Sequence, residues 1–184
     1  MNKKSMIFMV SFLLIILIPT LIIGILNYSK EQKLNIKIEN SKETRVLSLD
    51  NITSPITFDH LRQIEMSKEY IIENSDLKYD NDSSKKDFSV EYTNTSYCGS
   101  RCIKEYFFVD EQLKMCIFNI DTSQWQPKNI YEELVKNNGE PDVSKTKSDK
   151  KGTDSYTWYG KNGVLSLRDD SISNNVEVVF EISK

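Results

Sequence analysis

The 184-residue chain contains no alanine, one histidine and three cysteines. A single histidine excludes a poly-histidine metal site, and a catalytic triad would leave no histidine for another role. The six glycines are scattered and form no Gly-x-Gly motif, so no phosphate-binding loop is expected. The formal charge of −3 lacks the clustered excess of Lys and Arg that is typical of nucleic-acid-binding proteins.

Hydrophobicity is concentrated near the N-terminus. Between Met6 and Leu26, 17 of 21 residues are apolar and none is charged. A helix of this length measures about 31 Å, enough to cross the hydrocarbon core of a bilayer. Lys3 and Lys4 precede the run, so the positive-inside rule keeps the N-terminus in the cytoplasm. We predict a cytoplasmic tip at 1–5 and a transmembrane signal anchor at 6–27, in a single-pass protein of the cell (inner) membrane whose C-terminal domain faces the periplasm or the outside.

A cleaved signal peptide is the alternative interpretation of this run. Signal peptides have a shorter apolar region, of about 7–15 residues, and an Ala-x-Ala-like cleavage site. Without alanine, such a site could use only residues such as Gly24 or Ser29, with bulky residues between them. Lipidation is not expected, because the first cysteine is Cys98. The absence of alanine therefore favours a retained anchor.

The predicted exported part is acidic. Residues 28–184 contain 22 basic and 27 acidic residues, so they have no electrostatic reason to lie on anionic lipid. We predict a polar stalk or linker at 28–53, in which brief alternation would fit one edge strand. The residues from Ile56 and Phe58 onward fit a strand or a helix equally well.

The remainder repeats one pattern at 54–122 and 123–184. Each half is predicted to be a helix followed by three antiparallel strands, which gives an α+β fold. A helix is expected over 68–74 with Ser67 as N-cap, and another after Pro127, ending at Gly139. Alternating residues predict strands over 88–92, 103–109, 113–120, 155–159, 164–168 and 176–182, with loops at 76–86 and 143–153 and an Asn-Gly hairpin turn at 161–163.

The second half carries a family resemblance. A helix with Leu134 is followed by Gly139-Glu140-Pro141, by a strand with Trp158 and by two more strands. This order resembles the small outer-membrane assembly lipoproteins of the SmpA/OmlA type and the tandem-repeat β-lactamase inhibitor proteins. The segment 64–71 resembles the start of the same unit, although Glu65 replaces the usual glycine. The resemblance implies an α+β repeat and a binding role from about residue 56 onward. The lipoprotein role does not carry over, because there is no lipidation cysteine.

The cysteines are the main candidates for covalent chemistry. An exported location favours a disulfide among Cys98, Cys102 and Cys116. Hairpin pairing places Cys116 nearer Glu105 or Tyr106 than Cys102, so a Cys98–Cys102 bridge is favoured. Another pair is the alternative, and Cys116 is expected to be a buried thiol.

Two further roles for the cysteines are weighed. A zinc site would combine the three cysteines with His60; the Cys-x3-Cys spacing is permissible, but His60 lies in another element. A nucleophilic cysteine with His60 as base would need an orienting group that no motif specifies. We therefore predict no metal, no cofactor and no catalytic residue.

Partner contact is expected at two places. Trp125 lies outside the strand alternation, so it is a candidate hot spot for a protein partner, or else a hydrophobic staple onto the next helix. The Lys-rich loop is either solvated or in contact with an acidic partner; it contains Lys145, Lys147, Lys150 and Lys151. Glu132 and Glu133 are expected to be solvated helix residues, and they make a poor acid/base pair because adjacent helix positions do not face each other.

These features predict a non-enzymatic, membrane-anchored extracytoplasmic module. It would bind an unidentified protein of the cell envelope, in assembly or as an inhibitor, without nucleic acid. The alternative is an envelope immunity or exclusion protein that acts against a toxin or phage. A more remote alternative is an enzyme that acts on an envelope component.

Overall fold

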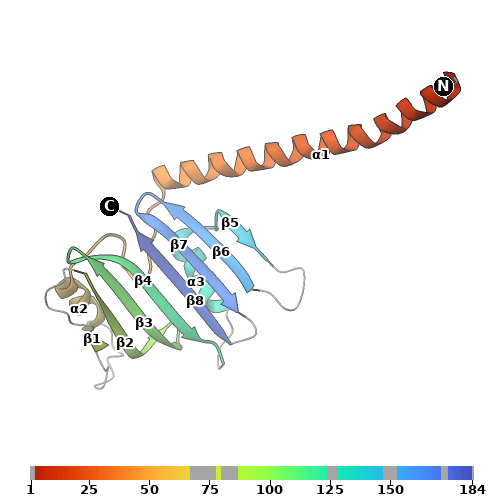
Figure 1. The fold of residues 1–184 in the computed structure, drawn as a ribbon. Helices are drawn as coiled ribbons and strands as arrows, with labels where there is room; N and C mark the ends of the chain where they lie inside the picture. Colours follow the sequence, from red (N-terminus) through yellow and green to blue (C-terminus); the bar gives the residue numbers. More distant parts are fainter. Residues whose placement is uncertain are drawn as a thin grey trace. The chain divides into compact units, whose positions relative to one another are not determined.

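The computed structural model describes residues 3–66, 78–79, 87–123, 128–146, 153–170 and 174–183. The chain divides into two compact units, Met1–Glu39 and Asn40–Lys184. Helix α1 (Lys3–Thr44) forms the first unit and continues into the second (Figure 1). Among the described residues, no helix is both long enough and apolar enough to count as a membrane span. The predicted helix over 6–27 is thus observed, and its passage through a membrane stays a prediction.

The second unit is an α+β domain built on one eight-stranded antiparallel sheet (Figure 1). Helix α2 (Phe58–Met66) precedes the first four strands, and α3 (Lys128–Asn138) precedes the last four. The strands are β1 (Lys78–Tyr79), β2 (Phe88–Tyr97), β3 (Ser100–Val109), β4 (Gln112–Asp121), β5 (Val143–Lys145), β6 (Thr153–Gly160), β7 (Gly163–Asp170) and β8 (Asn175–Ile182). Their order in the sheet is β1-β2-β3-β4-β8-β7-β6-β5, so each half is a meander and the last strands of the two halves pair at the centre.

The α+β class and the six predicted strands are confirmed as β2, β3, β4, β6, β7 and β8. Each half has four strands rather than three, because β1 and β5 form short edges within stretches that were expected to be loops. The hairpin turn between β6 and β7 consists of Lys161 and Asn162, and Gly163 already pairs with Gly160. The order of helix and meander occurs twice, and the equivalence of the halves as a repeat stays a prediction.

The first helix of the domain begins earlier than predicted. Helix α2 includes 64–66, which the sequence pattern assigned to the approach to a helix at 68–74; that predicted helix lies outside the described residues. The hydroxyl of Thr57 caps α2 by accepting the amide of His60 at 3.4 Å. Phe58 packs edge-on against Phe88 and Phe108, with ring centres 5.9 Å away in both pairs. Phe58 is thus partly buried, on a helix in a segment whose pattern fitted a strand and a helix equally.

The predicted stalk at 28–53 is also different in the structure. Its first part is helical, and the compact domain already begins at Asn40. Leu47, Leu49 and Ile52 are at most 1% exposed. Asp50 and Asn51 form a tight turn with positive φ angles of 54° and 70°, closed by backbone hydrogen bonds between Leu49 and Ile52. The alternation seen in the sequence therefore marks a core segment and not a linker.

The second helix of the domain agrees with prediction. Ile130 and Leu134 of α3 are buried on the face that packs on the sheet. Gly139 follows α3 with a φ angle of +74°, and its amide donates to the carbonyl of Val135 at 2.7 Å. The indole of Trp158 donates to the carbonyl of Gly139 at 2.7 Å. This contact couples the end of α3 to strand β6.

Helices α2 and α3 pack on one face of the sheet and not on the other. Side chains alternate in burial along β3, β4 and β8, and the buried set includes Tyr106, Phe118 and Phe180. Helices α2 and α3 both pack on this covered face through contacts such as Phe58–Phe108 and Trp158–Tyr131. Neither helix covers the opposite face, which we call the open face (Figure 1).

Candidate functional site

A buried charged cluster lies under the 48–52 turn. The ammonium of Lys104, which is 1% exposed, donates to Asp50 at 2.6 Å and lies 3.5 Å from a carboxylate oxygen of Glu65. The other oxygen of Glu65 accepts the hydroxyl of Tyr106 at 2.7 Å. We call these four residues the lysine cluster. It joins β3, α2 and the turn through side chains that are largely withdrawn from water.

The two neighbouring carboxylates keep the ammonium of Lys104 protonated. Burial alone would lower the pKa of Lys104, but the carboxylates of Asp50 and Glu65 outweigh burial and raise the pKa above its ordinary value. The ammonium also lies 5.0 Å from the ring centre of Phe118, within the range of a cation–π contact. Burial raises the pKa of Tyr106 well above its ordinary value, so Tyr106 stays a hydrogen-bond donor.

A second polar cluster holds the end of α1 within the domain. The carboxylate of Asp142 accepts the hydroxyl of Ser41 and the guanidinium of Arg45, both at 2.8 Å, and the amide of Tyr159 at 2.9 Å. We call Asp142, Ser41 and Arg45 the aspartate cluster. Asp142 directly follows the Gly139-Glu140-Pro141 motif, so the end of α3 places this carboxylate.

Two amide side chains bind the backbone of the 45–53 segment. Asn138 accepts the amide of Ser48 at 2.7 Å and donates to its carbonyl at 3.0 Å. Asn162 does the same for Leu47, at 2.7 Å in both directions, and also donates to Thr53. These bonds satisfy backbone groups, most of them partly buried, in a segment without regular strand pairing. They explain why an irregular segment can run through the core.

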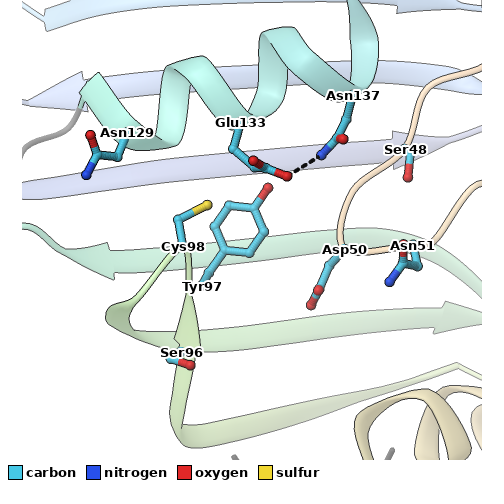
Figure 2. Close-up of a pocket in the computed structure, with 9 residues that line it drawn as sticks. All are labelled: Ser48, Asp50, Asn51, Ser96, Tyr97, Cys98, Asn129, Glu133 and Asn137. Atoms are coloured by element: carbon cyan, nitrogen blue, oxygen red, sulfur yellow. Dashed lines mark hydrogen bonds between the residues drawn. The ribbon is translucent and has the colours of Figure 1, made fainter. Parts of the chain in front are cut away.

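A polar pocket lies between α3, the 48–51 turn and the β2–β3 hairpin (Figure 2). Its volume is about 670 Å³, within the range of small-ligand sites. It is lined by Ser48, Asp50, Asn51, Ser96, Tyr97, Cys98, Asn129, Glu133 and Asn137. Asn129, Glu133 and Asn137 follow one another at intervals of four along one face of α3. The lining is therefore rich in hydrogen-bonding side chains, and Asp50 links it to the lysine cluster.

The hairpin turn presents Tyr97 and Cys98 to this pocket. Cys98 and Gly99 have positive φ angles of 50° and 79°, as in a two-residue type I′ turn, and Tyr97 pairs with Ser100. Figure 2 shows the hydroxyl of Tyr97 and the sulfur of Cys98 directed toward the helix that carries Glu133. Burial raises the pKa of Cys98 to about 11, assisted by the charge of Glu133. The thiol is thus protonated at neutral pH, which disfavours a nucleophilic role.

The favoured Cys98–Cys102 bridge between two of the three cysteines stays a prediction. All three lie in the described part of the chain and are thiols. Cys102 faces Thr95 across the hairpin, whereas Cys98 occupies the turn itself, so the two are not cross-strand partners. Thr95 lies 3.2 Å from the sulfur of Cys102. The expected proximity of Cys116 to Tyr106 is confirmed by their direct pairing, and Cys116 is buried.

No group of three or more His, Cys, Asp or Glu side chains suited to a metal occurs among the described residues. His60 is exposed on α2, whereas Cys102 and Cys116 are buried in the sheet. Of the predicted partner-binding residues, Lys145 lies exposed on the edge strand β5. Trp125, Lys147, Lys150 and Lys151 lie outside the described residues. The structure therefore neither assembles nor separates these four.

Sequence reasoning missed both the lysine cluster and the pocket. Lys104 occupies an inward position in the alternation Cys102, Lys104, Tyr106, Phe108, and that position is the signal that could have marked it. The polar stripe at 129, 133 and 137 beside the apolar Ile130 and Leu134 was likewise readable. The proximity of Asp50 and Glu65 to Lys104 could not be read, because it depends on tertiary packing.

Comparisons of the chain with protein-family models, with curated proteins and with solved structures give no match. The resemblance to the SmpA/OmlA-type lipoproteins and the β-lactamase inhibitor proteins therefore stays a prediction.

Proposed function

We propose that the protein is a membrane-anchored, extracytoplasmic binding module that recognises a protein partner through the open face, without catalysis. The observation that carries this proposal is the uncovered apolar surface at the centre of the sheet. Ile103 and Val109 are 41% and 42% exposed, and Phe107, Met115, Ile117 and Val179 are half-buried. Register pairs Ile117 with Val179 and Phe107 with Met115, so these four side chains form two adjacent apolar cross-strand pairs. Such surfaces on soluble domains are typical of interaction sites.

The charge of the open face indicates the kind of partner. Glu91 and Glu105 face each other directly across β2 and β3, and Lys78 of β1 pairs in register with Glu91 on its other side. Burial, followed by the charges of Glu91 and Glu177, raises the pKa of Glu105. Arg168 lies 3.7 Å from Glu177. We therefore expect a partner with an apolar centre flanked by Lys or Arg.

Membrane attachment belongs to the same proposal. The run from Met6 to Leu26 is uncharged. Within it, Leu21, Ile22, Ile23, Ile25 and Leu26 are each at least 50% exposed. A lipid environment would cover them. Cell fractionation followed by protease treatment of intact cells tests this part. Recovery in the soluble fraction would contradict it.

In-cell photo-crosslinking tests the binding surface. A photoreactive amino acid at Ile103 should give one discrete adduct of the full-length protein, and Val179→Arg should abolish that adduct. The same probe at Val46, which is 46% exposed outside the sheet, serves as the matched control. Equal adducts at both positions, or an adduct that survives Val179→Arg, would contradict recognition through the open face.

A further inference from the structure

The pocket under α3 has a chemical character that the proposed function does not use. It lies on the covered face, because Tyr97 contacts Phe118 there at a ring-centre distance of 5.4 Å. Its lining contains two carboxylates, Asp50 and Glu133, and no Lys or Arg appears among the residues described as lining it. An anionic ligand is therefore disfavoured.

Of the described residues, two cations contact these carboxylates and neither lines the cavity. Lys104 is buried behind Asp50 and bonds to it from the core side. Lys136 contacts Glu133 at 3.2 Å, but its side chain is 73% exposed, so this pair is weak. Hydrogen bonds from Asn137 and Lys136 lower the pKa of Glu133, which keeps its carboxylate charged at neutral pH. Two carboxylates thus line the cavity, and that of Asp50 is already paired with Lys104.

The remaining lining suits a cation that carries several N–H donors. Side chains that can accept hydrogen bonds line all three walls: Ser48 and Asn51 on the turn, Ser96 on the hairpin and Asn129 on α3. The ring of Tyr97 adds an aromatic surface, and carboxylates with an aromatic ring form the usual setting for guanidinium and ammonium groups.

We propose that this pocket binds an organic cation, a guanidinium or primary ammonium group, between Glu133 on α3 and Asp50 on the 48–51 turn. The cavity of about 670 Å³ accommodates such a group on an alkyl chain. The cation belongs to a free small molecule or to a basic side chain of a protein partner, and both sources offer the same chemistry.

The test uses the full-length protein in detergent micelles and N-methylguanidinium as the probe, at constant ionic strength. Backbone amide NMR signals of Cys98, Asn129 and Asn137 should shift saturably. N-Methylurea has the same shape without the charge and should bind about tenfold more weakly. Equal binding of the two compounds, or no saturable shift, would overturn the proposal.

Variants assign the binding to the pocket. Glu133→Gln should weaken N-methylguanidinium binding by about fivefold or more, since it removes the charge at a partly exposed position and leaves the fold intact. Glu132→Gln removes the neighbouring exposed charge outside the pocket and should change affinity by less than about twofold. Asp50 is not substituted, because its loss would leave the buried ammonium of Lys104 without this carboxylate partner. Identical effects of the two glutamate variants would refute the site.

Crosslinking separates the two sources of the cation. With Glu133→Gln present, the Ile103 adduct should become weaker if the pocket holds a side chain of that partner. An unchanged adduct assigns the pocket to a free small molecule. The probe titration does not involve the open face, so failure of the cation site and failure of the proposed function give different results.

Discussion

The domain holds its N-terminal segment at two places that differ in chemistry. At the lysine cluster, one buried ammonium meets two carboxylates, and Lys104 and Glu65 are 1% and 5% exposed. At the aspartate cluster, one buried carboxylate meets a hydroxyl, a backbone amide and an Arg45 side chain that is 22% exposed. Loss of the central group leaves two carboxylates without their cation in the lysine cluster. In the aspartate cluster it leaves mainly neutral hydrogen-bond donors. The two should therefore differ in their sensitivity to mutation.

The largest effect is expected for Lys104→Met. It leaves Asp50 and Glu65 without their buried cation, which should lower the free energy of unfolding by about 3–5 kcal/mol. Denaturant unfolding of the full-length protein, followed by tryptophan fluorescence, measures this. Lys136→Met removes an exposed pair and should cost less than about 1 kcal/mol. Similar losses in both variants would remove the basis of the comparison.

The pH dependence of the unfolding free energy of Lys104→Met tests whether the charge of Lys104 is the source of the stabilisation. Because folding raises the pKa of Lys104 above its ordinary value of 10.5, its stabilisation is complete below that pH and is lost as pH rises through the folded pKa. The difference in unfolding free energy between the wild type and Lys104→Met should therefore shrink above about pH 10.5. A difference that is constant into more alkaline solution would contradict this origin.

A smaller effect is expected for Asp142→Asn. The amide keeps one acceptor, but loses the charge that Arg45 and Ser41 share, so we expect a loss of about 2 kcal/mol in unfolding free energy. Thermal unfolding, with Glu140→Gln as an exposed control in the same segment, measures it. A loss as large as that of Lys104→Met would show that the two clusters are equivalent.

Loss of the hydrogen bonds of an uncharged side chain, Asn162, should lower the free energy of unfolding less than loss of a buried charge. Asn162→Ala removes hydrogen bonds to Leu47 and Thr53, and we expect a loss of about 1–2 kcal/mol, with faster amide exchange at Leu47. Lys161→Ala in the same turn is the control, because its exposed side chain has no such role. Unchanged exchange at Leu47 would refute the proposed support of the segment.

The smallest effect on stability is expected at Cys98. Cys98→Ser should change unfolding free energy by less than about 0.5 kcal/mol, since the residue lies in a turn at the pocket edge. With its pKa raised to about 11, Cys98 should react slowly with iodoacetamide at pH 8 and much faster as pH approaches 11. Mass spectrometry of the alkylated protein measures the rate. Rapid labelling at pH 7 would indicate a thiolate and contradict this environment.

Much of the fold could be predicted from local patterns. Period-two alternation identified β2, β3, β4, β6, β7 and β8, and the Gly139 signal identified the end of α3. The short edges β1 and β5 were missed because two or three residues carry no periodic signal. Their existence depends on the neighbouring strand that offers them hydrogen bonds.

The candidate site was less predictable. The stripe at 129, 133 and 137 was visible, and Glu133 is 37% exposed as expected, but nothing local places the hairpin turn of Cys98 opposite it. The favoured Cys98–Cys102 bridge stays a prediction. The turn begins at Cys98, which sets Cys102 across from Thr95.

The sequence by itself determined the N-terminal helix, the α+β class and the alternation that separates two sheet faces, because these follow from composition and periodicity along the chain. Only the tertiary structure decided that 45–53 enters the core, that Lys104 is buried with Asp50 and Glu65, and that α3 closes a polar pocket over the hairpin. The physical reason is that a buried charge or a free backbone amide becomes acceptable only when a partner arrives from elsewhere in the chain, and local sequence does not encode that meeting.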